Sequence, residues 1–257
     1  MDYTPESINE KTINNKKRVQ NHGEVFTPER IIKKMLDLPA ISEACRNLTS
    51  TFLEPAAGEG AFLVEVLNRK IDMVIKNYSD NLTSYENYSL LALTTLYGIE
   101  LLEDNALKCV MNMYQAYYEA YQNQARKHKE GMKPEVLASA KLIISKNIVQ
   151  GNFLTQLSYN GKPLVFSKWQ AINSCTRAKV LNVQRTEHTL HDILEAAKEE
   201  NKGFSAYLSK LEQLDLFNLF DTEEIVKPKS RQMRYISVEI TDVYKEEMEE
   251  INGQDND

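Results

Sequence analysis

The segment 52–63, which reads FLEPAAGEGAFL, constrains the fold of this chain more than any other. An apolar run ends in Glu54, passes through a turn of small residues with Gly58 and Gly60, and continues from Ala61 with its apolar residues at helical spacing. Glycine lacks a Cβ, so the backbone can bend sharply and a ligand can approach it closely. The free N–H groups of the following helix favour a carboxylate or a phosphate. The segment therefore predicts a strand, a tight turn and a helix, as in nucleotide-type sites of α/β proteins.

The turn differs from the dinucleotide-binding fingerprint. That fingerprint needs a third glycine three residues after the second, where this chain has Leu63. The next strand that ends in an acid is expected at 96–100, so that Glu100 follows Glu54 by 46 positions, against about 20 in a minimal dinucleotide-binding unit. Two helices between the strands, rather than one, account for the extra length.

Four segments, in order along the chain, resemble DNA adenine N6-methyltransferases of restriction–modification systems. Residues 53–63 resemble the loop that binds S-adenosylmethionine (SAM), and residues 23–28 (GEVFTP) resemble the segment that closes over its methionine end. Residues 97–100 (YGIE) resemble the second strand, whose terminal acid holds the ribose. Residues 147–154 (NIVQGNFL) resemble the third strand, where an acid usually holds the adenine amine. The resemblance covers roughly residues 20–157, a little over half of the chain.

This resemblance implies a fold and a division into domains. The fold would be α/β, a Rossmann-like SAM-dependent methyltransferase sheet flanked by helices, with an N-terminal helical segment and a small C-terminal α+β extension. The expected parts are a polar N-terminal arm, the SAM-binding domain, a divergent C-terminal region and an acidic tail, at residues 1–20, 21–157, 158–240 and 241–257.

The resemblance also assigns roles to individual residues. It implies that Glu54 and the turn backbone hold the methionine end of SAM, helped by residues 26 and 27, and that Glu100 binds the ribose hydroxyls. Asn152 would face the adenine amine. An uncharged amide there gives hydrogen bonds of about 1 kcal/mol, against roughly 1.5–3 kcal/mol for charged ones, so we expect modest affinity for SAM. The implied cofactor-binding residues are Phe26, Thr27, Glu54, Ala56, Gly58, Gly60, Glu100, Asn152 and Phe153.

The chain departs from the family in its catalytic motif, Asn/Asp/Ser-Pro-Pro-aromatic, which holds the flipped adenine. None of its seven prolines is adjacent to another, so the sequence assigns no catalytic residue. Three functions stay open. The chain could be a DNA adenine methyltransferase, alone or with a partner that supplies the catalytic loop. It could be an inactive SAM-binding subunit with a regulatory or interaction role. It could also methylate RNA or protein.

Charge permits a DNA partner without indicating one. The net charge is −6, whereas phosphate binding relies on clustered Lys and Arg. Residues 239–257 hold eight acids and one lysine, so the rest of the chain is close to neutral. Basic residues cluster at 16–18, 30–34, 126–129 and 227–234, and each cluster is also typical of a solvated surface.

Cysteine, apolar and histidine content bears on disulfides, membrane segments and metal sites. Three widely spaced cysteines argue against a disulfide framework and suit the cytoplasm. No apolar run approaches 18 residues and the first 18 residues are polar, so we expect neither a membrane span nor a signal peptide. His188 and His191 are three apart, but no further histidine or cysteine lies nearby, so we expect no metal site.

Apolar spacing predicts the other elements. Helices are expected at 29–38, with Thr27 as N-cap and Pro28 as first residue, and at 61–78, 89–96, 106–127 and 135–141. Residues 77–88 read as a polar connection. Strands are expected at 164–166 and 235–240, and helices at 186–201 and 203–220. The acidic remainder is expected to be a mobile tail or a frayed helix.

Two aromatic groups allow two interpretations each. Tyrosines along 114–121 suit either a stacking surface for single-stranded nucleic acid or, as we expect, a buried face packed on the sheet. Trp169 and Asn173 are the residue types that stack on and hydrogen-bond a flipped base, so a degenerate target-base loop is one interpretation. A core or interface position for Trp169 is the other, and we favour it.

Overall fold

A three-stranded parallel sheet lies at the centre of the α/β fold. The computed structural model describes residues 26–172, 180–200 and 233–250. Strands β1 (Phe52–Glu54), β2 (Leu96–Glu100) and β3 (Ile148–Gln150) pair in the order β1-β2-β3. All three strands run in one direction, so their carboxyl ends form one edge of the sheet.

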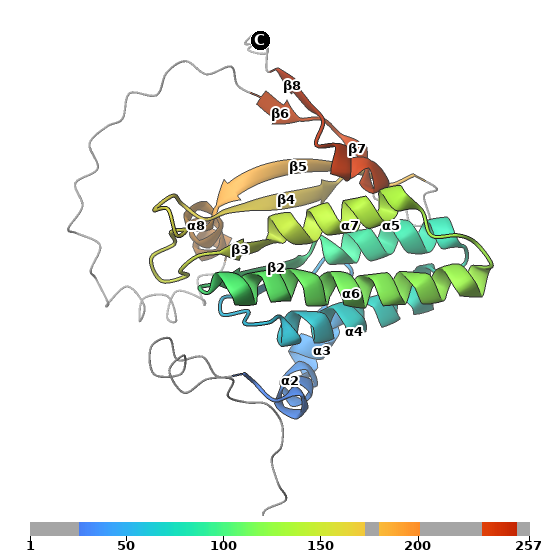
Figure 1. Ribbon diagram of the computed structural model, residues 1–257, viewed down its shortest axis with the longest axis horizontal. Helices are drawn as coiled ribbons and strands as arrows, with labels where there is room; N and C mark the ends of the chain where they lie inside the picture. Colours follow the sequence, from blue (N-terminus) through green and yellow to red (C-terminus); the bar gives the residue numbers. More distant parts are fainter. Residues whose placement is uncertain (1–25, 173–179, 201–232, 251–257) are drawn as a thin grey trace, which may run out of the picture.

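Two pairs of helices make the crossovers between these strands. Helices α4 (Ala61–Tyr78) and α5 (Leu82–Leu93) connect β1 to β2, and α6 (Glu103–His128) and α7 (Pro134–Asn147) connect β2 to β3. The expectation of two helices between Glu54 and Glu100 is therefore confirmed. Figure 1 shows these helices as a layer, with β4 and β5 on one side and α2 (Glu29–Leu36) and α3 (Pro39–Cys45) on the other.

The sheet is covered on both faces of β2. Gly98 faces the helical layer, where a Cβ would lie 2.9 Å from Leu63 Cδ1 and 3.0 Å from Ile148 Cδ1. Neighbouring residues of a strand point to opposite faces. Accordingly, Tyr97 and Ile99 face a second apolar cluster that contains Leu164, Phe166 and Leu190.

The C-terminal part is a small mixed unit. Strands β4 (Val165–Ala171), β5 (Asn182–Thr189) and β7 (Val238–Glu239) form an antiparallel sheet, and α8 (Leu190–Glu200) follows β5. A 3-10 helix, η2 (Ile240–Lys245), packs against α7, and β6 (Met233–Tyr235) pairs with β8 (Met248–Glu250). The expected helical N-terminal arm and the expected helix at 203–220 lie outside the described residues.

The structure corrects several of the sequence expectations. The polar connection expected at 77–88 is wrong, because α5 starts at Leu82 and all of its residues except Thr83 are buried. Asn81 Oδ1 accepts from the Ser84 N–H at 2.9 Å at the start of this helix. The helix expected from 186 starts only at Leu190, after β5. The strand expected at 235–240 is divided into β6 and β7, and residues 241–250 hold η2 and β8 rather than a frayed helix.

Candidate functional site at the carboxyl edge of the parallel sheet

The turn after β1 adopts the conformation that its glycines make possible. Gly58 has φ +54° and Gly60 has φ +88°, a region that residues with a Cβ rarely adopt. The Gly60 N–H donates to Ala57 O at 2.8 Å, and the Ala57 N–H donates to Ile99 O at 2.9 Å, which ties the turn to β2. The turn therefore sits over the ends of both strands, and α4 begins at its last residue.

Glu100 joins the two strands at this edge. Its side chain is only 7% exposed, and its two oxygens accept from the backbone on opposite sides. The Gly58 N–H donates to Oε2 at 2.7 Å and the Leu102 N–H donates to Oε1 at 2.9 Å. The structure thus brings the predicted ribose-binding acid against the predicted glycine turn, 42 positions away in sequence.

Glu54 lies at the end of β1, half-buried. Its Oε1 accepts from the Ala56 N–H at 3.2 Å. Burial raises the pKa of the Glu54 carboxyl, and the Ala56 hydrogen bond partly offsets this effect. A buried carboxylate with one neutral donor has further acceptor capacity and gains from a cation beside it. Glu54 is therefore suited to a ligand ammonium group.

Phe26 closes the turn from the N-terminal side. A Cβ on Gly58 would lie 3.5 Å from Phe26 Cε1, so the ring is in contact distance of the turn backbone. Thr27 is exposed and does not cap α2, because Pro28 is the N-cap residue and the helix runs only over Glu29–Leu36. The expected cap at Thr27 is wrong, whereas its role toward a cofactor stays a prediction.

The two residues expected near the adenine ring lie after β3. Asn152 Oδ1 accepts from the Leu154 N–H at 2.8 Å and the Thr155 N–H at 3.3 Å, so its oxygen holds its own turn. Phe153 packs against the second apolar cluster, the one with Ile99 and Phe166. The structure thus gathers six predicted residues at one edge, with Asn152 and Phe153 at the adjacent strand end. The six are Phe26, Glu54, Ala56, Gly58, Gly60 and Glu100.

Helix α6 supports the turn through residues that sequence reasoning missed. Lys108 Nζ lies 2.7 Å from Glu59 Oε1, and Asn112 Nδ2 donates to Glu59 O at 2.8 Å. The Cys109 thiol lies behind Gly60, and burial, with the charges of Glu100 and Glu54 nearby, raises its pKa to about 12. Cys109 is thus a neutral packing group rather than a nucleophile. No sequence signal marks these residues, since only helix packing brings them to the turn.

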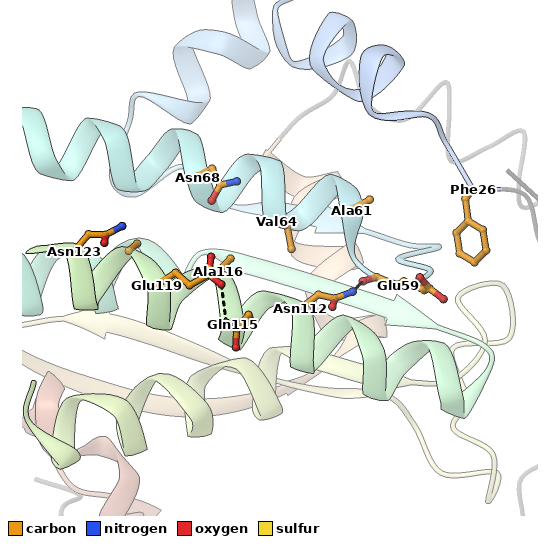
Figure 2. Close-up of a pocket in the computed structure, with 11 residues that line it drawn as sticks. Phe26, Glu59, Ala61, Val64, Asn68, Asn112, Gln115, Ala116, Glu119 and Asn123 are labelled. Atoms are coloured by element: carbon orange, nitrogen blue, oxygen red, sulfur yellow. Dashed lines mark hydrogen bonds between the residues drawn. The ribbon is translucent and has the colours of Figure 1, made fainter. Parts of the chain in front are cut away.

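A cavity of about 710 Å³ lies on the helical side of the turn, between α4 and α6 (Figure 2). It starts beside Phe26 and Glu59, but neither Glu54 nor Glu100 lines it. It is therefore distinct from the carboxyl edge of the strands. Small side chains and amides make up most of its lining: Ala61, Val64, Asn68, Asn112, Gln115, Ala116, Glu119, Ala120 and Asn123.

The aromatic groups take structural positions. Trp169 is 9% exposed and its Nε1–H donates to Asn147 Oδ1 at 3.0 Å, while the Arg185 guanidinium lies over its ring. Trp169 is thus a core residue, as we favoured, and Asn173 lies outside the described residues. Tyr117 and Tyr121 on α6 are fully buried. The buried-face interpretation is confirmed for these two tyrosines, whose hydroxyls contact Ser89 and Glu86 of α5 rather than the sheet, whereas Tyr114 and Tyr118 are only partly buried.

Searches for other site types and for relatives add no assignment. Among residues 26–172, 180–200 and 233–250, no group of three or more His, Cys, Asp or Glu side chains could hold a metal ion. Within the same ranges, no helix is both long and apolar enough to cross a membrane. Comparison of the chain with protein-family models, with curated proteins and with solved structures gives no match.

Proposed function

We propose that this chain binds SAM and belongs to the DNA adenine N6-methyltransferases, transferring a methyl group from SAM to adenine in DNA, alone or with a partner that supplies the missing catalytic loop. One observation carries the proposal. The Glu100 carboxylate at the end of β2 receives the Gly58 N–H of the turn after β1, at the common carboxyl edge of adjacent parallel strands. Ligands of open α/β sheets bind in the crevice at this edge.

The chemistry of the donor set fits SAM. A carboxylate has about four acceptor positions, and the two backbone donors to Glu100 leave capacity for the two ribose hydroxyls. Glu54 supplies a negative charge for the methionine ammonium. The N–H groups at the start of α4, which no side chain caps, suit its carboxylate. The glycine turn lets the ligand approach the backbone, and Phe26 covers it. When bound, SAM supplies an electrophilic methyl group on a sulfonium.

The adenine end of the proposed site offers an amide that already has backbone partners. Asn152 Oδ1 already accepts two backbone N–H groups, so it can receive the adenine amine only if its own turn opens or the oxygen is shared. It also carries no charge. Both features support the expectation of modest affinity.

Turnover depends on what positions the target base. Methyl transfer requires the adenine amine to be desolvated and aligned with the methyl group. The adjacent prolines that shape the family's loop are absent from the sequence. A SAM-binding subunit without activity is therefore the second candidate. Labelled methyl groups transferred to unmodified DNA by the purified chain would show that it is active without a partner, and label in RNA or protein would indicate another substrate class.

A pair of matched substitutions in the turn tests the binding site. Gln at position 54 keeps the acceptor for the Ala56 N–H but loses the charge, so Glu54→Gln should weaken binding of S-adenosylhomocysteine about tenfold in calorimetry. Glu59→Gln removes the same charge five residues later, where it faces Lys108, and should leave the affinity within about twofold. Equal affinities for both variants would place the ligand elsewhere.

A further inference from the structure

The cavity between α4 and α6 is rich in hydrogen-bond acceptors and has no basic side chain in its lining. Figure 2 shows it along the two helices, with Phe26 and Glu59 at one end and Asn123 at the other. Of the eleven described residues that line it, two are acids, four are amides and none is Lys, Arg or His. Such a surface favours a positively charged occupant, because complementary charges attract.

The amides of this cavity donate to its acids, which leaves acceptors for an occupant. Asn112 Nδ2 donates to Glu59 O at 2.8 Å, and Gln115 Nε2 donates to Glu119 Oε1 at 2.6 Å. The amide oxygens of Asn112 and Gln115 keep their acceptor capacity. Lys108 pairs with Glu59, whereas the partner of Glu119 among the described residues is the neutral Gln115. Glu119 therefore supplies a negative charge that no described cation balances.

The floor of the cavity is apolar and its length suits a short peptide segment. Val64 of α4 and Ala116 and Ala120 of α6 line it and pack against the main core. Side chains this short let another backbone lie close to the helices. Along α6, the lining runs from Asn112 to Asn123, which is roughly 16 Å at the helical rise. About five residues of extended chain have this length.

We propose that residues 11–23 of this same chain bind in the cavity and thereby hold Phe26 against the Gly58 turn. Phe26 is the first described residue and itself lines the cavity, so the segment before it is attached there. Residues 11–23 hold four bases, Lys11, Lys16, Lys17 and Arg18, and no acid. The ten residues 16–25 reach roughly 33 Å when extended, about twice the length of the cavity. This inference goes beyond the proposed function, because it needs no cofactor.

The other segments outside the described residues fit this cavity less well. They are 173–179, 201–232 and 251–257, and none of the described residues that they adjoin lines the cavity. Residues 173–179 connect β4 to β5, which are paired up to Ala171 and Val183. Residues 201–232 hold five bases and five acids, and residues 251–257 hold two acids and no base. Attachment and charge together therefore favour residues 11–23.

A nitroxide label inside the cavity tests the inference in the full chain. The label is attached at Asn123→Cys after Cys175→Ser, while Cys45 and Cys109 stay because both are buried. In an NMR spectrum of amide groups, it should broaden the signals of residues 11–18 and leave those of residues 251–257 sharp. The same label at Lys168→Cys, exposed on β4 at the other side of the helical layer, should leave both sets sharp (Figure 1).

Charge exchange tests what selects the occupant. Glu119→Lys should raise the released fraction of the segment about threefold, measured as recovered signal intensity of residues 11–18. Adding Lys16→Glu and Lys17→Glu should restore the broadening. Glu103→Lys, on the same helix but outside the cavity, should leave it unchanged. Salt raised from about 0.1 M to about 1 M should also release the segment, because the Debye length falls from about 10 Å to about 3 Å.

Three results would overturn the inference. The first is sharp signals of residues 11–18 with the label in the cavity, or equal broadening of residues 251–257. The second is full broadening that survives Glu119→Lys, since charge would then not select the segment. The third is broadening in a mixture of labelled chains without isotope and isotope-enriched chains without label, equal to that within one chain. In that case a second copy would supply the segment.

Discussion

Among the glycines that the structure describes, only Gly60 combines a left-handed backbone with a crowded Cβ position. Its φ is +88°, and a Cβ at this position would lie 2.7 Å from the Cys109 Sγ and 3.2 Å from the Cys109 Cα. A left-handed conformation costs a residue with a Cβ roughly 1–2 kcal/mol, and forced overpacking costs about 1–3 kcal/mol. Gly60→Ala should therefore lower the free energy of unfolding by about 2–4 kcal/mol in urea denaturation.

Gly131 is the matched control for Gly60. A Cβ there meets no atom within 4 Å and its φ is not in the left-handed region. Gly131→Ala should change the free energy of unfolding by less than about 0.5 kcal/mol. In the Cys109→Ala background, Gly60→Ala should cost less than in the wild type, because the sulfur is gone. A loss below about 1 kcal/mol for Gly60→Ala alone would show that the turn is not held as described.

Lys70 is a buried cation beneath β1 whose charge makes stability depend on pH. Its ammonium donates to Asn47 O at 2.7 Å and Ser50 O at 2.9 Å, and burial lowers the pKa of Lys70 from 10.5 to about 8. The unfolded chain then binds this proton more tightly than the folded chain. The charged form costs stability below pH 8, and the cost disappears as pH rises from about 8 to about 10.5.

Comparison with Lys70→Met isolates this group from the tyrosines. The free energy of unfolding of the wild type, minus that of the variant, should rise by up to about 3 kcal/mol between pH 8 and pH 10.5. Denaturation of both proteins at a series of pH values measures it. A difference that stays constant or falls over this range would mean that Lys70 keeps an ordinary pKa in the folded protein.

At the residue scale, the sequence identified the side chains that belong to a local motif. Glu54 ends one apolar strand, Gly58 and Gly60 lie in the turn after it, and Glu100 ends the next strand, so all four were expected at the carboxyl edge of one sheet. Asn152 was expected just after the third strand, and it lies there. The hydrogen bonds that its side-chain oxygen accepts from the following backbone were not foreseen. Such bonds depend on the conformation of the following turn, which the residue types leave open.

Helix α5 is held in the core by a buried carboxylate. Glu86 is 1% exposed, accepts a hydrogen bond from the Tyr121 hydroxyl of α6, and lies 2.6 Å from Lys133 Nζ before α7. Removing one member of a buried pair leaves the other uncompensated, and Lys133 is only partly exposed. Glu86→Ala should therefore destabilise the protein by about 3 kcal/mol in urea denaturation.

Glu119 serves as the control for Glu86. It lies on the exposed side of α6 and accepts from Gln115 at 2.6 Å. Glu119→Ala should change the free energy of unfolding by less than about 0.5 kcal/mol. Equal effects of the two substitutions would contradict the role of Glu86 as a link between three helices.

At the element scale, helices with one exposed face were predicted from the sequence more accurately than buried helices. Helix α4 has one apolar stripe, and its bounds, Ala61–Tyr78, were predicted from spacing. Helix α5 is buried at every residue except Thr83 and includes Glu86 and Asn87. It therefore has no apolar stripe, and its first half was expected to be a polar connection. The start of α8 was placed early because Thr186 resembled a cap, whereas Thr189 and Asp192 form the reciprocal cap: the Asp192 N–H donates to Thr189 Oγ1 at 3.2 Å.

At the scale of the whole molecule, the chain folds as a parallel half-sheet with an antiparallel unit on one face. A sheet flanked by helices was implied by the family resemblance, and the α/β class followed from the strand–turn–helix pattern, whereas the order of the strands comes from the structure. A small C-terminal α+β extension was expected, but β5 was not foreseen, because β4 and β5 pair across a connection with no turn signature. This unit covers Tyr97 and Ile99 of β2, and only the packing in the structure shows that it does.

Thermal unfolding of the full chain with S-adenosylhomocysteine tests the central claim most directly. A ligand at about 100 times its dissociation constant stabilises the folded state by roughly 2.7 kcal/mol, which for a chain of this size raises the midpoint by about 5–10 °C. We expect such a shift with SAM and with S-adenosylhomocysteine, and none with NAD, because Leu63 replaces the third glycine. No shift at millimolar S-adenosylhomocysteine, or an equal shift with NAD, would contradict the assignment of this edge as a SAM site.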